Sequence, residues 1–376
     1  MIIKNAKVFM PAGKFEKKNI YIENDTFTEV SEKNEQADEV CLDASGLFAI
    51  PGLTDIHFHG CAGYDFCDGT EEAIQAIADY ELANGITNIV PATMTYGEDK
   101  LTEIALAAKA HDNKEGAALL GINMEGPFIS MAKKGAQNPA YIHTPDVDMF
   151  RRLQEVSGGL FKLVDIAPEE ENSMEFIEAL KDEVGISIAH TTADYETACQ
   201  AFEKGARQVT HLYNAMPPFS HRAPGVIGAA YDHSHVRVEL ICDGIHIHPS
   251  VVRATFQLFS DDRVILISDS MMATGLEDGD YSLGGQAVKV TGPLATLSDG
   301  TIAGSATNLF NCLRTAVLKM NIPLESAVKA AAVNSAKAVN IYDHHGSIEK
   351  GKAADLLLLD KDLQLVHVIH NGKLVS

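Results

Sequence analysis

The strongest constraint on the fold is a strand–loop–helix pattern that repeats through the middle of the chain. Eight short apolar runs alternate with stretches of helical periodicity. The runs cover residues 53–57, 86–92, 118–124, 161–167, 184–190, 207–211, 236–242 and 263–269. Strands that alternate with helices form parallel sheets, and eight such strands close a (β/α)8 barrel. We therefore predict an α/β fold with a TIM barrel; an open doubly wound sheet is the alternative.

Helix-boundary residues support this pattern. Thr70 is followed by two glutamates and can cap a helix that Gly85 ends. Pro249 suits the first turn of another helix. The weakest helical stretch is 226–232, just before the seventh strand. Residues 275–300 are rich in glycine and turn residues, which predicts a hairpin inserted near the barrel mouth.

Both ends of the chain instead show short alternating strands separated by turns. These strands are expected at 2–9, 19–24, 26–30, 355–360 and 363–370, with a hairpin turn at Asn371-Gly372. We predict a small β-sandwich domain built from residues 1–52 and 344–376. The catalytic barrel would then span residues 53–343.

Composition excludes several partners. The chain has 376 residues, with 52 Asp and Glu against 30 Lys and Arg, a formal charge of −22. Such a field repels nucleic acid and anionic membranes, and a phosphorylated substrate would need a local basic patch. The six cysteines are scattered, with no CxxC pair, as in reduced thiols. With no signal peptide or membrane-spanning run, we expect a cytoplasmic protein.

Potential metal ligands lie at the carboxyl ends of five of the eight predicted strands. They are His57, His59, Glu125, His190, His211 and Asp269. The carboxyl ends of barrel strands meet at one mouth, where active sites lie. Side chains at i and i+2 of an extended segment point the same way, so His57 and His59 can bind one ion together. Imidazole and carboxylate ligands suit Zn, Fe, Mn or Co, and an open coordination position leaves room for water.

Each of these residues has a simpler interpretation when taken alone. A lone HxH pair is usually incidental, a strand-end histidine is more often a hydrogen-bonded core residue, and an aspartate there is commonly a helix cap. His233, His235, His344 and His345 lie in polar loops, and we expect no ligands there. Six ligand-type residues at five strand ends are not explained in this way.

The ligand pattern resembles the amidohydrolase superfamily. Many members use a modified lysine after strand four, but here that strand ends in Ile166-Ala167-Pro168. Glu125, in the segment MEGPF after strand three, replaces it, and this substitution resembles the N-acetylglucosamine-6-phosphate deacetylases. Further similar motifs are PGLTDIHFHG (51–60), KKGAQNP (133–139), HLYNAMPPFSHRAPG (211–225), DGIHIHP (243–249) and LISDSMMATG (266–275).

The resemblance implies a role for each candidate residue. Glu125, His190 and His211 would form the metal site common to the family, and His57 with His59 would complete a second. One or two divalent ions are therefore implied, with Asp269 as a further ligand and as the general acid/base. Substrate contacts are implied for Ala136, Asn214, Ala215, Arg222, His246, Ile302, Ala303 and Gly304. Relatives often carry a histidine where Gln137 stands, so we leave Gln137 outside the catalytic set.

The implied activity is deacetylation of N-acetylglucosamine 6-phosphate by metal-bound hydroxide. The resemblance also implies a homodimer in which Arg222 binds the phosphate in the partner's active site. Two alternatives stay open at this point. One is an amidohydrolase for another N-acylated aminosugar or a cyclic amide, and the other is a metal-free scaffold relative.

Overall fold

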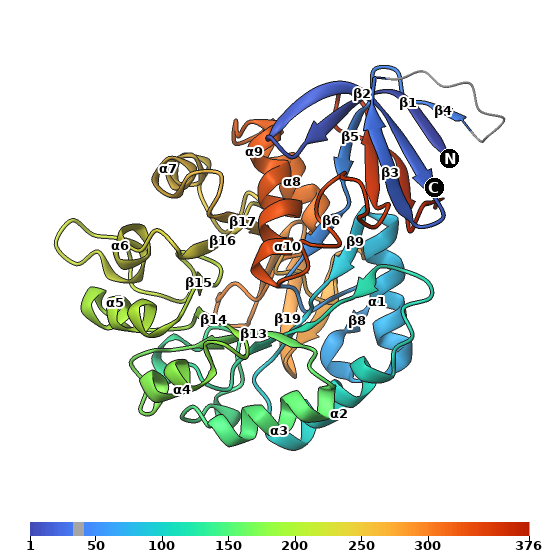
Figure 1. Cartoon of the computed structure of the whole chain (residues 1–376). Coiled ribbons are helices and arrows are strands. Elements are labelled where there is room, and N and C mark those ends of the chain that lie inside the picture. The colour runs from blue at the N-terminus through green and yellow to red at the C-terminus, as the bar shows by residue number, and fades with distance from the viewer. Residues whose placement is uncertain (33–40, 376) are drawn as a thin grey trace.

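The described residues, 1–32 and 41–375 of a computed structural model, form a (β/α)8 barrel joined to a smaller sheet (Figure 1). Each predicted barrel strand is present. The strands are β6 (Leu53–Asp55), β9 (Ile86–Ile89), β12 (Ile122–Glu125), β13 (Phe161–Ile166), β14 (Gly185–Ile188), β15 (Gln208–Val209), β16 (Arg237–Ile241) and β17 (Val264–Ile267). The prediction of a barrel is confirmed.

The barrel strands pair in parallel and in chain order. One sheet runs β10-β12-β13-β14-β15-β16-β17, where β10 is Ala92–Thr93, and a second runs β11-β9-β6, where β11 is Ala118–Leu119. The two sheets are continuous because β9 and β10 are one strand interrupted at Val90-Pro91. The amide of Asp269 donates to the carbonyl of His57 over 2.9 Å, which joins the last strand to the first.

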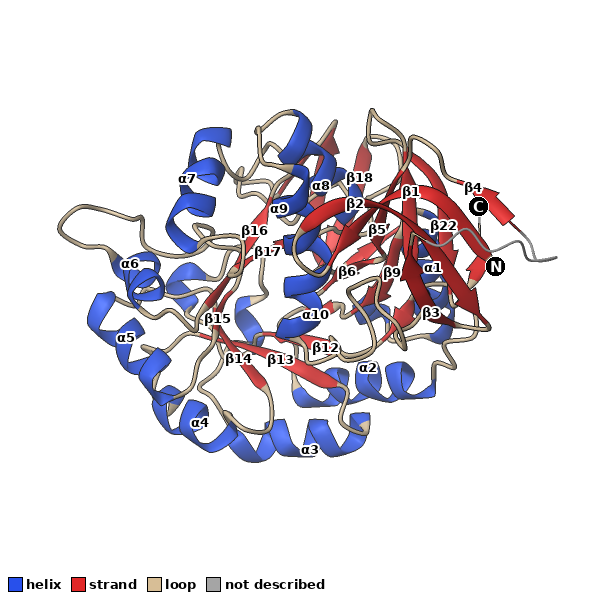
Figure 2. Cartoon of the chain, turned by 45° about the horizontal axis from the view of Figure 1, so that its top comes forward, coloured by secondary structure: helices blue, strands red, loops and turns tan. Residues whose placement is uncertain are grey.

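Helices cover the outside of these strands (Figure 2). They are α1 (Glu71–Ala83), α2 (Glu98–Ala110), α3 (Val147–Ser157), α4 (Ser173–Leu180), α5 (Tyr195–Lys204), α6 (Gly225–Asp232), α7 (Pro249–Phe259), α8 (Leu309–Leu318), α9 (Leu324–Val328) and α10 (Asn334–Ala338), with a π-helical turn at Lys329–Val333. Thr70 caps α1 by accepting from the amide of Ala73, and Pro249 begins α7, as predicted. In the described ranges, no helix combines the length and the apolar character needed to cross a bilayer.

The ends of the chain combine in one mixed sheet. Its order is β23-β22-β21-β5-β1-β2-β3, with β4 beside β1. The strands are β1 (Ile2–Met10), β2 (Lys14–Glu23), β3 (Thr26–Ser31), β4 (Cys41–Asp43), β5 (Phe48–Pro51), β21 (Leu356–Leu359), β22 (Leu365–His370) and β23 (Lys373–Leu374). This confirms a small β domain built from both termini, and the boundaries at residues 52 and 344 remain a proposal.

Strand β21 connects the two parts of the molecule through its alternating side chains. Leu356 and Leu358 are buried in the core of the terminal sheet, whereas Leu357 and Leu359 belong to the main core, where barrel strands and helices pack together. Leu357 packs so closely on Gly85 that a Cβ there would lie 2.8 Å from the leucine Cδ1. The terminal sheet is therefore fixed to the barrel by apolar packing.

The predicted insertion is a three-stranded antiparallel sheet. It consists of β18 (Gly279–Leu283), β19 (Gln286–Thr291) and β20 (Leu294–Thr296), one strand more than a hairpin. The side chain of Gln286 donates to the carbonyl of Ala136, in the loop after β12. The insertion therefore lies at the barrel mouth, as predicted. The remaining short elements are β7 (Gly60–Cys61), β8 (Tyr64–Asp65) and the 3-10 turns Phe66–Asp68, Met131–Lys133 and Pro139–Tyr141.

Asp355 ties the C-terminal strands together. Its carboxylate accepts from His370 Nδ1 at 2.8 Å and from the amide of Asn371 at 2.9 Å, and it lies 3.3 Å from His345 Nδ1. Burial alone would raise the pKa of Asp355, but these contacts with His345 and His370 hold it well below the usual range. The folded state therefore favours the ionised carboxylate.

We predict that Asp355→Asn lowers the free energy of unfolding at pH 7 by about 1–3 kcal/mol, because buried donors lose a charged acceptor. A lowered folded-state pKa adds stability above the unfolded value of about 4, and this stability is lost as pH falls below it. The difference between variant and wild type in urea unfolding should therefore shrink as pH falls through 4. Asp362→Asn, at an exposed ion pair with Lys361, is the control. A difference that does not change with pH would contradict this role.

Candidate active site

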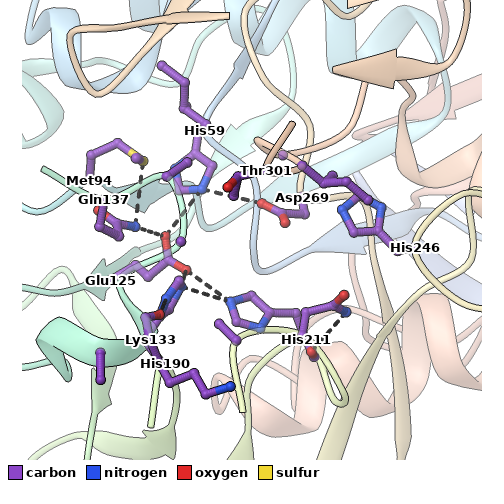
Figure 3. Close-up of a pocket in the computed structure, with 18 residues that line it drawn as sticks. His59, Met94, Glu125, Lys133, Gln137, His190, His211, His246, Asp269 and Thr301 are labelled. Carbon is purple, nitrogen blue, oxygen red and sulfur yellow. Dashed lines mark hydrogen bonds and ion pairs between the residues drawn. The ribbon is translucent and has the colours of Figure 1, made fainter. Parts of the chain in front are cut away.

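Six side chains from the carboxyl ends of five barrel strands converge at the barrel mouth. His57 and His59 follow β6, Glu125 ends β12, His190 follows β14, His211 follows β15 and Asp269 follows β17. All six are buried. Figure 3 shows His59, His190 and His211 directed toward Glu125, with Asp269 on the far side of His59. The structure thus brings together every ligand that the sequence predicted.

The carboxylate of Glu125 is the centre of this cluster. Its Oε1 lies 3.0 Å from His190 Nε2 and 3.2 Å from His211 Nε2. The same oxygen is 3.4 Å from His57 Nε2, and Oε2 is 3.3 Å from His59 Nε2. Two groups of three could each hold an ion: His57, His59 and Glu125, and Glu125, His190 and His211. Glu125 is common to both groups.

The cluster fits a divalent metal. His190 Nε2 and His211 Nε2 lie 3.2 Å apart and approach the same carboxylate oxygen, an arrangement that one cation between them would satisfy. His57 Nε2 is buried and has no hydrogen-bond partner among the described residues. Buried polar atoms are normally paired, so this nitrogen is available to coordinate a metal ion. Nitrogen and oxygen donors of this kind suit Zn, Fe, Mn or Co.

The electrostatics favour positive charge at the same place. Burial opposes a charged imidazole, yet Glu125 and Glu239 raise the pKa of His57 well above its usual range. For His59, Asp269 and Glu125 outweigh the same penalty and raise the pKa to about 10. Burial would raise the pKa of Glu125, but the surrounding histidines hold it well below normal. A metal cation would balance these carboxylates in place of protons.

Two buried acids below the cluster support the ligands. Glu239 accepts from the amide of His211 at 3.2 Å and lies 3.4 Å from His57 Nδ1. Its other oxygen accepts from Gln208 at 2.5 Å, and Asp165 lies 3.9 Å from the same His57 nitrogen. Carboxylates behind ligating histidines orient the rings. The sequence reasoning missed both acids, although each interrupts an apolar run at a position that faces the barrel interior.

The backbone turns sharply where three of these residues leave their strands. His190, His211 and Asp269 have φ angles of 45°, 29° and 51°. Residues other than glycine rarely adopt the left-handed region, which costs about 1–2 kcal/mol per residue. Strained backbone is concentrated at functional sites, where surrounding contacts hold it in place. The three side chains are thus held at a position that their backbone alone would not favour.

A pocket of about 380 Å³ opens above the cluster. Of the predicted substrate contacts, those that line it are Ala136, Asn214, Ala215, His246, Ile302 and Gly304. Ala303 is buried and is not among the lining residues, and Arg222 is exposed in the segment before α6 and is also outside the lining of its own chain's pocket. His246 is oriented by Asp243, whose Oδ2 lies 2.7 Å from the imidazole Nδ1.

Gln137 and Lys133 also line the pocket. The side-chain amide of Gln137 donates to Glu125 Oε2 over 2.6 Å, and its carbonyl accepts from the amide of Thr95 at 2.7 Å. The carbonyl of Lys133 lies 2.8 Å from His190 Nδ1, which fixes that ring from behind. Leaving Gln137 out of the catalytic set therefore overlooked a direct contact with the shared carboxylate.

Known proteins resemble the chain over nearly its whole length. A family model described as the amidohydrolase family matches residues 48–375. An N-acetylglucosamine-6-phosphate deacetylase of Bacillus subtilis is 40% identical over 331 residues, 86% of this chain and 84% of the relative. One of Lysinibacillus sphaericus is 33% identical and covers 100% of this chain and 97% of its own length.

Solved structures agree with the sequence matches. A mutant N-acetyl-D-glucosamine-6-phosphate deacetylase of Mycobacterium smegmatis, in complex with N-acetyl-D-glucosamine-6-phosphate, superposes with a TM-score of 0.94. It is 30% identical, and the match covers 100% of this chain and 99% of that one. Because the family model and these relatives match most of the sequence, the chain belongs to the amidohydrolase family.

Proposed function

We propose that this protein removes the acetyl group from N-acetyl-D-glucosamine 6-phosphate to give D-glucosamine 6-phosphate and acetate. The observation that carries the proposal is the cluster around Glu125, with Asp269 beside it on the floor of the pocket. Strong similarity to enzymes named for this reaction supports the substrate. A panel of phosphorylated and unphosphorylated N-acyl aminosugars and a cyclic amide, assayed for acetate or amine release, tests it. Faster turnover of any other compound in the panel would favour the alternative function, an amidohydrolase acting on another N-acylated aminosugar or a cyclic amide.

Glu125, His190 and His211 would hold one divalent ion, and His57 with His59 would help to hold a second. When bound, the metal supplies Lewis acidity that polarises an amide carbonyl and makes water more acidic. The remaining requirement is proton transfer, because an amine is a poor leaving group unless it is protonated. These ligands suit Zn, Fe, Mn or Co, and the availability of each metal in the cell also determines which one is bound.

Asp269 would carry the proton. Its Oδ1 lies 3.3 Å from His59 Nε2, and its side chain faces the pocket. Burial would raise the pKa of Asp269, but His59 and His57 lower it, so the carboxylate is ionised and can accept a proton. In our proposal Asp269 takes the proton of the attacking water and returns it to the departing nitrogen.

The phosphate requires positive charge that the chain as a whole does not offer. Among the residues given as lining the pocket, Lys133 is the one lysine or arginine, and its Nζ donates to the carbonyl of Met216 over 3.4 Å. Arg222 makes no ion pair within the described ranges, and its planar guanidinium suits phosphate. We propose a cytoplasmic homodimer in which each Arg222 reaches the partner's pocket, as a two-fold axis requires.

We predict that a chelator abolishes activity and that a divalent metal restores it.

Glu239→Gln should lower metal affinity by about ten- to a hundredfold, because it removes the carboxylate behind His57 and His211. Competition with a metallochromic chelator measures this directly. Glu203→Gln, on the exposed face of α5, is the matched control. Wild-type metal affinity in Glu239→Gln would rule out its orienting role.

Asp269→Asn should keep the fold and most of the bound metal while lowering kcat by about 10²–10⁴-fold. The amide keeps the shape of the side chain but cannot accept the proton. Steady-state kinetics with metal analysis separate this loss from loss of the ion. Asp262→Asn, at a surface ion pair with Lys329, should be neutral. Near-normal kcat in Asp269→Asn would assign proton transfer to another group.

Arg222→Ala should raise KM for the phosphorylated substrate by about ten- to a hundredfold, since charge-assisted contacts contribute roughly 1.5–3 kcal/mol. The decisive experiment mixes Arg222→Ala chains with Asp269→Asn chains. A shared site predicts that mixed dimers regain one intact site, so activity exceeds that of either variant. If subunits exchange and no activity returns, Arg222 does not act in trans.

A further inference from the structure

Four basic side chains line a cavity at the end of the barrel opposite the metal cluster. Lys162 is in β13, Lys181 follows α4, Arg207 precedes β15 and Arg237 begins β16. The cavity has a volume of about 310 Å³. Catalytic residues of barrels lie at the carboxyl ends of the strands, whereas the amino ends usually serve stability. A concentration of cations at the amino ends therefore needs another explanation.

The four cations are brought together by neighbouring strands. The amide of Arg237 donates to the carbonyl of Arg207 over 2.9 Å, so the two arginines lie side by side where the adjacent strands β15 and β16 start. Between them and Lys162 lies Gly185, the first residue of β14. A Cβ on Gly185 would lie 2.8 Å from Leu163 Cδ2, and its absence leaves this part of the wall without a side chain.

The aliphatic parts of both lysines pack against glycines. A Cβ on Gly121 would lie 2.3 Å from Cγ of Lys162, and one on Gly205 would lie 2.6 Å from Cβ of Lys181. Lys162 Nζ also donates to the carbonyl of Gly159 over 3.3 Å. Packed side chains lose less conformational freedom when they bind a ligand. The two lysines are therefore partly held in place before any ligand arrives.

The charge in this cavity is not balanced by the protein. Only two of its lining residues are acidic, Asp182 and Glu183, and Glu183 is already paired with Arg151 at 2.7 Å. Within residues 1–32 and 41–375, the guanidinium groups of Arg207 and Arg237 make no ion pair or hydrogen bond. Burial and the nearby charge of Arg207 both lower the pKa of Arg237. Such a pair is repulsive unless an anion lies between the two groups.

We propose that this cavity binds the phosphate group of a small metabolite at a site separate from the metal cluster. Arginine presents a planar set of donors that matches a tetrahedral dianion, and two arginines with two lysines supply the charge. A wider depression of about 1020 Å³ shares Lys181, Arg207 and Arg237 with the cavity. This depression gives room for the remainder of the metabolite. The chain has a formal charge of −22, so an anion is attracted only where cations are concentrated. The four basic side chains of this cavity provide such a place.

Hydrogen exchange of the metal-loaded protein tests the proposal with inorganic phosphate as the probe. At about 10 mM phosphate, enough to fill a site of millimolar Kd, peptides covering residues 203–210 and 234–240 should gain protection. Phosphate at the metal cluster would instead protect segments at the barrel mouth, so the location of protection distinguishes the two sites. Acetate at equal ionic strength should give no protection at the cavity.

The double variant Arg207→Gln with Arg237→Gln should bind phosphate at the cavity at least about tenfold more weakly. Lys17→Gln with Lys373→Gln, at exposed positions of the terminal sheet, removes the same charge and should behave as wild type. Deacetylation should be unchanged in both, which shows that each is folded. No protection in the wild type, equal protection by acetate, or undiminished binding by the arginine variant would overturn the proposal.

Discussion

The site depends on the contacts between the carboxylate of Glu125 and the four histidines around it. The carboxylate is buried at the barrel mouth and lies within 3.0–3.4 Å of imidazole nitrogens from three strand ends. A buried carboxylate without compensation is costly, so this position is stable only if cations or donors surround it. A closed parallel barrel meets that condition because the carboxyl ends of all its strands point to one mouth. The geometry of the whole barrel is therefore what makes a shared ligand possible.

Much of this arrangement could be predicted from sequence because its signals are local. Each apolar run is short and bounded by polar residues, and each ligand lies at the end of its run or within two residues of it, so periodicity alone places His57, Glu125 or His211 at a strand end. Thr70 and Pro249 mark helix starts for the same local reason. The weak helical stretch at 226–232 also became a helix, α6, of eight residues.

What could not be predicted depends on contacts between distant segments. Glu239 and Asp165 appear in sequence as charges inside apolar strands, and only the closed barrel shows that they face His57. The bond from Gln137 to Glu125 depends on how the loop after β12 folds back. The formal charge of the sequence also does not show which buried acids are ionised. Burial raises the pKa of Asp55 to about 7 and that of Glu81 well above normal, so not every acid contributes a full charge.

Strand β21 has a consequence for how the chain is made. It pairs with β5, so that Leu356 lies opposite Pro51 in the sheet. During synthesis on a ribosome, β5 emerges long before β21 is made. One edge of β5 therefore stays unpaired during most of translation. Contacts so distant in sequence close slowly, because the loop between them costs entropy first. Nearly the whole barrel must therefore be translated before the terminal sheet can be completed, and until then β5 exposes an unpaired edge, which favours misassembly.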